Sequence, residues 1–141
     1  MLEEAKRQMY RNEVVFAEDN RPVHSVKALY NELNKEIFSG ELPAIEVKMN
    51  GRLSKTLGKA FYLLEAAGKM RPTRIEIKKS HRWTPRFLRK VMIHEMCHIW
   101  AYQFHNEDGH GKMFWQKMTE CGYPKYHDWE NSESWEKDIY C

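Results

Sequence analysis

The chain has 141 residues, of which 42% are hydrophobic and 30% are charged, and its formal net charge is +3. This length suits one domain with a hydrophobic core, and this composition excludes a disordered chain. No apolar run approaches the roughly 20 residues of a membrane-spanning helix, so we expect no membrane partner. The three cysteines are widely spaced and the N-terminus lacks a secretion-signal pattern, so we expect a cytoplasmic or nuclear protein.

Charge is distributed unevenly along the chain. Residues 52–90 contain 12 Lys and Arg against 2 Asp and Glu, whereas the segments on either side carry more acidic than basic residues. A basic segment between acidic ones favours contact with a polyanion, although such a run is often only a solvated face. Both interpretations stay open at this point.

The first predicted elements are a helix and three strands. Ser25 can cap a helix, and Gly40 stands where it would stop. Its apolar residues follow helical spacing: Val26, Leu29, Tyr30, Leu33 and Ile37. Alternation of apolar and polar residues predicts strands over 45–49 and 73–78, and another strand is expected near 59–64. We expect a small meander, hence an α+β fold whose three-stranded or slightly larger sheet packs against this helix and a central one.

The central helix is predicted to begin at Thr84-Pro85 and to continue to about Phe104. It is apolar nearly all round and contains His94-Glu95-Met-Cys-His98. Histidines four residues apart lie on one side of a helix and can bind one metal ion, usually zinc. The alternative is a buried helix with two core histidines, but buried polar groups are costly without a partner. We therefore favour a metal site.

A catalytic zinc site normally has a third protein ligand. His105 would return to the same helical face, but it would lie about 10 Å beyond His98 along the axis. His110 is better placed, because residues 106–109 form a turn and His110 stands between two glycines. A short amphipathic helix is expected to follow over residues 112–121. The carboxylate alternatives are Glu107, Asp108 and Glu120.

The motif His94-Glu-Met-Cys-His98, followed by Gly109-His-Gly111 and Phe114, resembles the Spartan-type protease core of the SprT-like zinc metalloprotease family. The first predicted helix and its exit through Leu42-Pro43 are similar to that family's opening helix. The resemblance covers about residues 26–127. It implies a zincin-like fold and one catalytic Zn²⁺ ion. It also implies three zinc ligands, which are His94, His98 and His110, and a general base, which is Glu95.

The resemblance and the composition together suggest three segments. We predict an N-terminal extension over residues 1–24, a SprT-like metalloprotease core over 25–127 and an acidic aromatic tail over 128–141. Many members of the family carry a cysteine zinc ribbon after the core, and this sequence shows none. The tail could limit access to the site or simply complete the fold.

The predicted function is zinc-dependent endopeptidase activity. Glu95 would take a proton from the attacking water and pass it to the leaving amine. The resemblance implies protein substrates that are bound or crosslinked to DNA. The alternative is a non-catalytic, zinc-stabilised DNA- or protein-binding module, which a fourth protein ligand in place of water would indicate. The negatively charged oxygen that forms on the substrate carbonyl during hydrolysis could accept further hydrogen bonds. The candidate donors are Arg86, Tyr123, Tyr126 and His127, although each is more often structural.

Single-stranded or damaged DNA is a possible partner through the basic region 52–90. The candidate contacts combine cations with an aromatic residue: Lys78, Lys79, Arg82, Trp83, Arg86, Arg89 and Lys90. Cations could pair with phosphates while Trp83 stacks on an unpaired base. Alternatively, Trp83 packs at the start of the central helix and the charges only solvate its exposed side.

Overall fold

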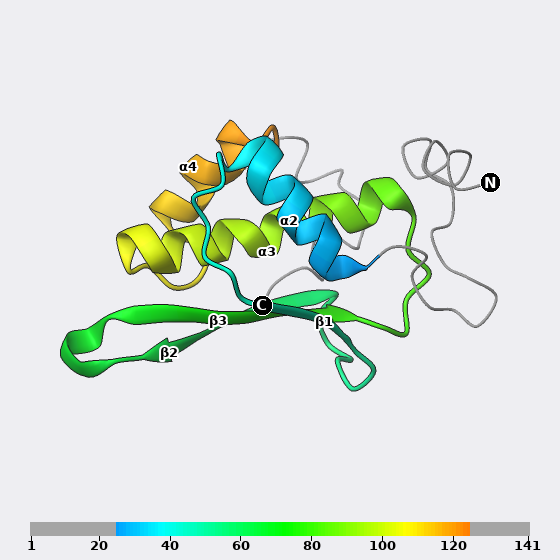
Figure 1. Cartoon of the computed structure of the whole chain (residues 1–141), viewed down its shortest axis with the longest axis horizontal. Coiled ribbons are helices and arrows are strands. Elements are labelled where there is room, and N and C mark those ends of the chain that lie inside the picture. The colour runs from blue at the N-terminus through cyan, green and yellow to red at the C-terminus, as the bar shows by residue number, and fades with distance from the viewer. Residues whose placement is uncertain (1–24, 125–141) are drawn as a thin grey trace.

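The computed structural model describes residues 25–124, so the predicted N-terminal extension and acidic tail lie outside the described residues. The elements in chain order are α2 (Val26–Ile37), β1 (Glu46–Asn50), β2 (Gly58–Leu64), the 3₁₀ turn η1 (Ala66–Gly68), β3 (Met70–Lys78), α3 (Pro85–His105) and α4 (Lys112–Glu120). The three helices lie on the same side of one sheet (Figure 1). The predicted α+β class is confirmed. No helix within this part of the chain has the length and apolar character to cross a bilayer.

The sheet has the strand order β1-β3-β2, so the expected meander is wrong. β2 and β3 form an antiparallel hairpin, but β1 pairs with the far side of β3 and runs parallel to it. β3 takes the centre because it carries Ile75 and Ile77, which are completely buried. The chain between β1 and β2 passes the end of β3, where the N–H of Lys78 donates to the carbonyl of Leu57. β2 is therefore an edge strand.

The helices begin where local sequence chemistry predicts. The Ser25 hydroxyl accepts hydrogen bonds from the N–H groups of Lys27 and Ala28 at the start of α2. The Thr84 hydroxyl accepts from the N–H of Phe87, and Pro85 occupies the first turn of α3. Both predicted helix starts are confirmed, and α4 confirms the short helix expected after the turn.

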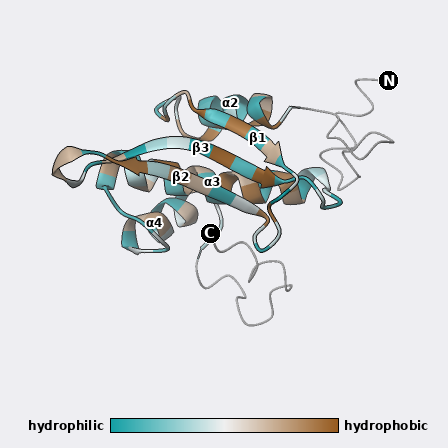
Figure 2. Ribbon diagram, turned by 90° about the horizontal axis from the view of Figure 1, so that it is seen from below, coloured by the Kyte–Doolittle hydropathy of each residue, from teal (hydrophilic) through white to brown (hydrophobic). Residues whose placement is uncertain are grey.

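α3 forms the middle of the molecule. Fourteen of its residues are buried, because it packs against β2, β3, α2 and α4. Viewed from below the sheet, α2 lies beside β1, whereas α4 lies beyond the free edge of β2 (Figure 2). The boundary between α3 and α4 is therefore on the same side of the molecule as the edge strand. This boundary is where the candidate site lies.

Candidate metal centre

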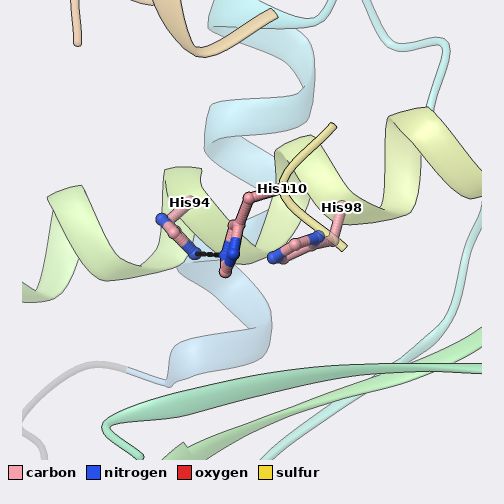
Figure 3. A group of neighbouring side chains, drawn as sticks. All are labelled: His94, His98 and His110. Atoms are coloured by element: carbon pink, nitrogen blue, oxygen red, sulfur yellow. Dashed lines mark hydrogen bonds between the residues drawn. The ribbon is translucent and has the colours of Figure 1, made fainter. Parts of the chain in front are cut away.

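Three histidines converge between α3 and the loop that follows it. His94 and His98 lie one turn apart on α3, and His110 reaches towards them from the α3–α4 loop (Figure 3). One ring nitrogen of each lies within 4.8 Å of the others. The Nε2 atoms of His94 and His110 are 3.2 Å apart. One helix and the loop that follows it thus present three imidazoles to one point.

The surroundings of these rings suit a metal ion. His98 is completely buried, and neither of its ring nitrogens has a hydrogen-bond partner among residues 25–124. Burial lowers the pKa of His98 to about 3, and it also lowers the pKa of His94 and of His110. The rings are therefore neutral at pH 7, with lone pairs available for coordination. A bound cation would satisfy nitrogens that are otherwise costly to bury.

An aromatic ring from α4 flanks the three histidines. Phe114 is fully buried, and its ring centroid lies 4.9 Å from that of His94, 4.3 Å from that of His98 and 4.8 Å from that of His110. It stacks on His98 with an interplanar angle of 25°. This contact limits how far each imidazole can turn, so α4 helps to orient the ligands.

Glu95 lies between α3 and the first residue of β2. Its side chain is completely buried. A Cβ atom added to Gly58 would lie 3.0 Å from both Cγ and Oε2 of Glu95. Only a residue without a side chain lets β2 approach this carboxylate so closely. Sequence reasoning missed Gly58, and its one signal was a glycine at the start of an otherwise regular strand.

Two of the alternative ligands lie away from the three-histidine group. The ring of His105 packs against Trp100 at a centroid distance of 4.5 Å, and the side chain is exposed. Glu120 is also exposed and accepts a hydrogen bond from Lys117. Neither residue belongs to the group of possible ligands found among residues 25–124.

The carboxylates of Glu107 and Asp108, both in the α3–α4 loop, accept hydrogen bonds from other residues. Glu107 accepts hydrogen bonds from the N–H groups of Met113 and Phe114. Asp108 accepts from the hydroxyl of Tyr62 on β2. Both were weaker ligand alternatives from the sequence, and neither joins the three-histidine group. Their contacts instead tie the loop to its neighbours.

The structure separates the cations of the predicted DNA surface from its aromatic residue. Trp83 is fully buried, its Nε1–H donates to the carbonyl of Lys78, and its ring lies 5.2 Å from that of Phe87. The expectation that Trp83 stacks on an unpaired base is therefore wrong, because its indole is part of the core. Packing at the start of α3, the alternative, is confirmed. The exposed members of the set are Lys79, Arg82 and Arg86.

Among the remaining cations, the Nζ of Lys78 donates to the carbonyl of Ser54, whereas Arg89 and Lys90 lie near Tyr123, just after α4. The Nζ of Lys90 lies 5.4 Å from the centre of the Tyr123 ring. Burial raises the pKa of Tyr123, and the nearby Arg89 and Arg86 oppose that shift. Arg89 also lies 3.8 Å from a carboxylate oxygen of Glu36. The other proposed oxyanion donors, Tyr126 and His127, lie outside the described residues.

Comparisons with known proteins agree with this geometry. The SprT-like family model matches residues 26–133. The human and Xenopus tropicalis proteins called DNA-dependent metalloprotease SPRTN are 29% and 30% identical to this chain over 100 residues. Those residues make up 69% of this chain, and 20% and 22% of the relatives. The Drosophila melanogaster germ cell nuclear acidic protein is 28% identical over 100 residues, which are 71% of this chain and 9% of that protein.

The chain thus spans about a fifth, or less, of the length of these relatives. The family model matches well over half of the chain. This chain therefore belongs to the SprT-like family.

Proposed function

We propose that this chain is a zinc-dependent endopeptidase. His94, His98 and His110 would hold one zinc ion, and Glu95 would be the general base. The observation that carries the proposal is the convergence of two buried imidazoles and a half-buried one beside a buried carboxylate, Glu95. Membership of a family with metalloprotease relatives supports the same conclusion.

The ligand set favours a catalytic site over a closed structural one. Imidazole nitrogens suit zinc, and catalytic zinc sites typically use three protein ligands and keep one position open. The group found among residues 25–124 has three members. Zinc in such a site lowers the pKa of bound water towards about 7 and polarises a peptide carbonyl. A non-catalytic, zinc-stabilised binding module would have no need of the buried Glu95.

Glu95 would carry out the proton transfers. Its carboxylate takes a proton from the attacking water and delivers it to the leaving amine. The backbone of β2 and the rigid helix α3 hold the carboxylate between them. A base fixed in this way needs little rearrangement during the reaction.

We propose that the substrate lies along the edge of β2 that pairs with no other strand of residues 25–124. β2 is an edge strand, and its first residue, Gly58, lies against Glu95. An extended peptide can add to such an edge through backbone hydrogen bonds. A peptide bound there would pass beside the proposed general base. Exposed Leu63 and Leu64 at the far end of β2 offer apolar contact for its side chains.

The decisive experiment compares wild type with Glu95→Gln and His110→Ala. Zinc content is measured after gel filtration, and hydrolysis is followed with a fluorogenic protein substrate. We expect one zinc per wild-type chain with hydrolysis, one zinc without hydrolysis in Glu95→Gln, and weakened zinc binding in His110→Ala. Normal turnover by Glu95→Gln would rule out its assignment as the base. A zinc-loaded wild type that never hydrolyses substrate would favour the binding module.

We also propose that the substrates are proteins bound or crosslinked to DNA, and that single-stranded or damaged DNA contacts the basic region 52–90. Support comes from relatives named DNA-dependent metalloproteases and from the exposed cations Lys79, Arg82 and Arg86. The Drosophila relative has "nuclear" in its name. A cytoplasmic or nuclear location, and the core boundaries 25–127, stay predictions.

A further inference from the structure

The loop between α3 and α4 contains a carboxylate whose role the proposed chemistry does not explain. The loop covers residues 106–111 and carries His110. It must run back along α3, because His98 lies roughly 10 Å before the end of that helix. We propose that Glu107 is the positioning residue that holds His110 in place for metal binding. This inference rests on the function proposed above.

Glu107 joins the start of the loop to the start of α4. Its Oε2 accepts from the N–H of Met113 at 3.0 Å, and its Oε1 accepts from the N–H of Phe114 at 2.8 Å. The first turn of a helix has N–H groups without partners inside the helix. The N-cap of α4 is Gly111, which makes no side-chain hydrogen bond to them. Glu107 supplies the missing acceptor, and its negative charge suits a helix N-terminus.

The carboxylate also fills the space beside Gly111, the residue that follows His110. A Cβ atom at Gly111 would lie 2.7 Å from Cδ and 2.8 Å from Oε2 of Glu107. The φ angle of Gly111 is −87°, which other residues adopt readily. The carboxylate, not the backbone conformation, therefore excludes a side chain here. Glycine after His110 lets Glu107 reach α4.

Glu107 thus connects the two helices on either side of His110. On one side its backbone N–H donates to the carbonyl of Ala101 near the end of α3, which fixes the point from which the carboxylate reaches out. On the other it fixes Phe114, whose ring contacts all three histidines. If the carboxylate were removed, both the loop and Phe114 would gain freedom, and His110 would spend less time near His94. The expected result is weaker metal binding by a protein that still folds.

The test measures zinc affinity by competition with a chromophoric chelator. Near-ultraviolet circular dichroism and thermal unfolding establish that each metal-free variant is folded at the assay temperature. We expect Glu107→Ala to bind zinc about 10- to 100-fold more weakly than wild type, the usual effect of losing a group that orients a ligand. Glu107→Gln should lose less, because its amide oxygen can still accept one of the two N–H groups.

Asp108→Asn is the matched control. It removes a charge from the same loop but leaves the contacts to α4 intact, so its zinc affinity should stay within about threefold of wild type. A cap that served only stability would lower the melting temperature of Glu107→Ala and leave the zinc affinity of the folded protein unchanged. That result would overturn the proposal.

A second variant tests the geometry directly. Gly111→Ala can be accommodated only if the flexible carboxylate of Glu107 moves, so it should weaken zinc binding much as Glu107→Ala does. In a Glu107→Ala background the added methyl group meets no carboxylate, and Gly111→Ala should cause no further loss. Fully additive losses would contradict the proposal. Absence of zinc binding by wild type would instead refute the function proposed above, and this role for Glu107 with it.

Discussion

The backbone of Gly58 lies in close contact with the side chain of Glu95. A Cβ at residue 58 would be 3.0 Å from Cγ and Oε2 of the carboxylate and 3.1 Å from Val91. Such a contact is too short for normal packing, so an added methyl group must displace the carboxylate by a fraction of an ångström. The edge strand and the proposed general base are thereby coupled by direct packing.

We therefore expect Gly58→Ala to reduce hydrolysis about tenfold or more while zinc content stays at the wild-type level. Small displacements of a reacting group lower the rate, and the three atoms nearest to an added Cβ belong to Glu95 and Val91 rather than to a histidine. Gly51→Ala is the control, because a Cβ there would meet only a Lys79 carbon at 3.9 Å. Steady-state kinetics with metal analysis checks the prediction, and equal rates for the two variants would contradict it.

Phe114 should influence metal binding through the shape of its ring. Phe114→Ala would remove a fully buried aromatic side chain and should destabilise the protein by about 3–5 kcal/mol. Phe114→Leu keeps most of the volume but loses the flat surface on which His98 stacks. We expect it to weaken zinc binding more than Met118→Leu, a conservative change at another buried position of α4. Chelator competition on the folded variants measures this difference.

Asn106 should stabilise the contact between the β2–β3 hairpin and α3. Its Oδ1 accepts from the N–H of Met70 at 2.6 Å, its Nδ2 donates to the carbonyl of Gly68 at 2.9 Å, and its φ angle is +50°. Asn106→Gly loses both hydrogen bonds but adopts positive φ readily, so it should cost about 1–2 kcal/mol. Asn106→Ala should cost more, because it loses the same bonds and also strains the backbone. Denaturant unfolding measures the stability of both variants. A larger loss of stability in Asn106→Gly than in Asn106→Ala would contradict the prediction.

Glu76 should make stability depend on pH in the acidic range. Burial alone would raise its pKa, but hydrogen bonds from Arg74 and Asn50, both at 2.8 Å, hold it below the ordinary value of 4.5. A carboxyl group with a lowered pKa in the folded state stabilises the fold fully above about pH 4.5, and this contribution is lost as pH falls below that value.

Glu76→Gln should therefore be about 2 kcal/mol less stable than wild type at pH 7, with the difference shrinking below about pH 4.5. Urea unfolding of both proteins at pH 7, 5 and 3.5 measures it. A difference that grows on acidification would show that the carboxylate is not stabilised in the folded state. Glu46→Gln, an exposed glutamate on the same sheet, is the control.

The exposed cations of the basic region should contribute salt-dependent affinity for single-stranded DNA. Replacing Lys79, Arg82 and Arg86 by serine should weaken binding and flatten the dependence of log affinity on log salt by about 0.7 for each phosphate that is no longer neutralised. Lys35 and Lys112, on α2 and α4, provide a control variant with charges removed outside this region. Fluorescence anisotropy at several salt concentrations measures the affinity of each variant for single-stranded DNA. Equal effects of the two variants would indicate only a general charge effect.

Local chemistry by itself determines the helix starts, the shared orientation of two histidines and the fold class. Ser25 and Thr84 define helix starts because a capping hydroxyl bonds to N–H groups only two or three residues away. His94 and His98 face one way because the helical repeat places residues four apart on one side. The α+β class followed from periodicity, and the turn before His110 was correctly expected to bring that residue back towards α3.

Only the tertiary structure decided how distant segments pair. The parallel pairing of β1 with β3 depends on which strand is buried on the core side, and no local pattern specifies a neighbour. The sequence left Trp83 either exposed among cations or packed at the start of α3, and its complete burial decides for packing. Gly58 against Glu95 is a contact between distant segments that arises from packing, and the loop that sets Glu107 against Gly111 takes its path from the two helices that it joins. Capping and helical periodicity depend on residues only a few positions apart, whereas these contacts form only when the helices and the sheet pack together.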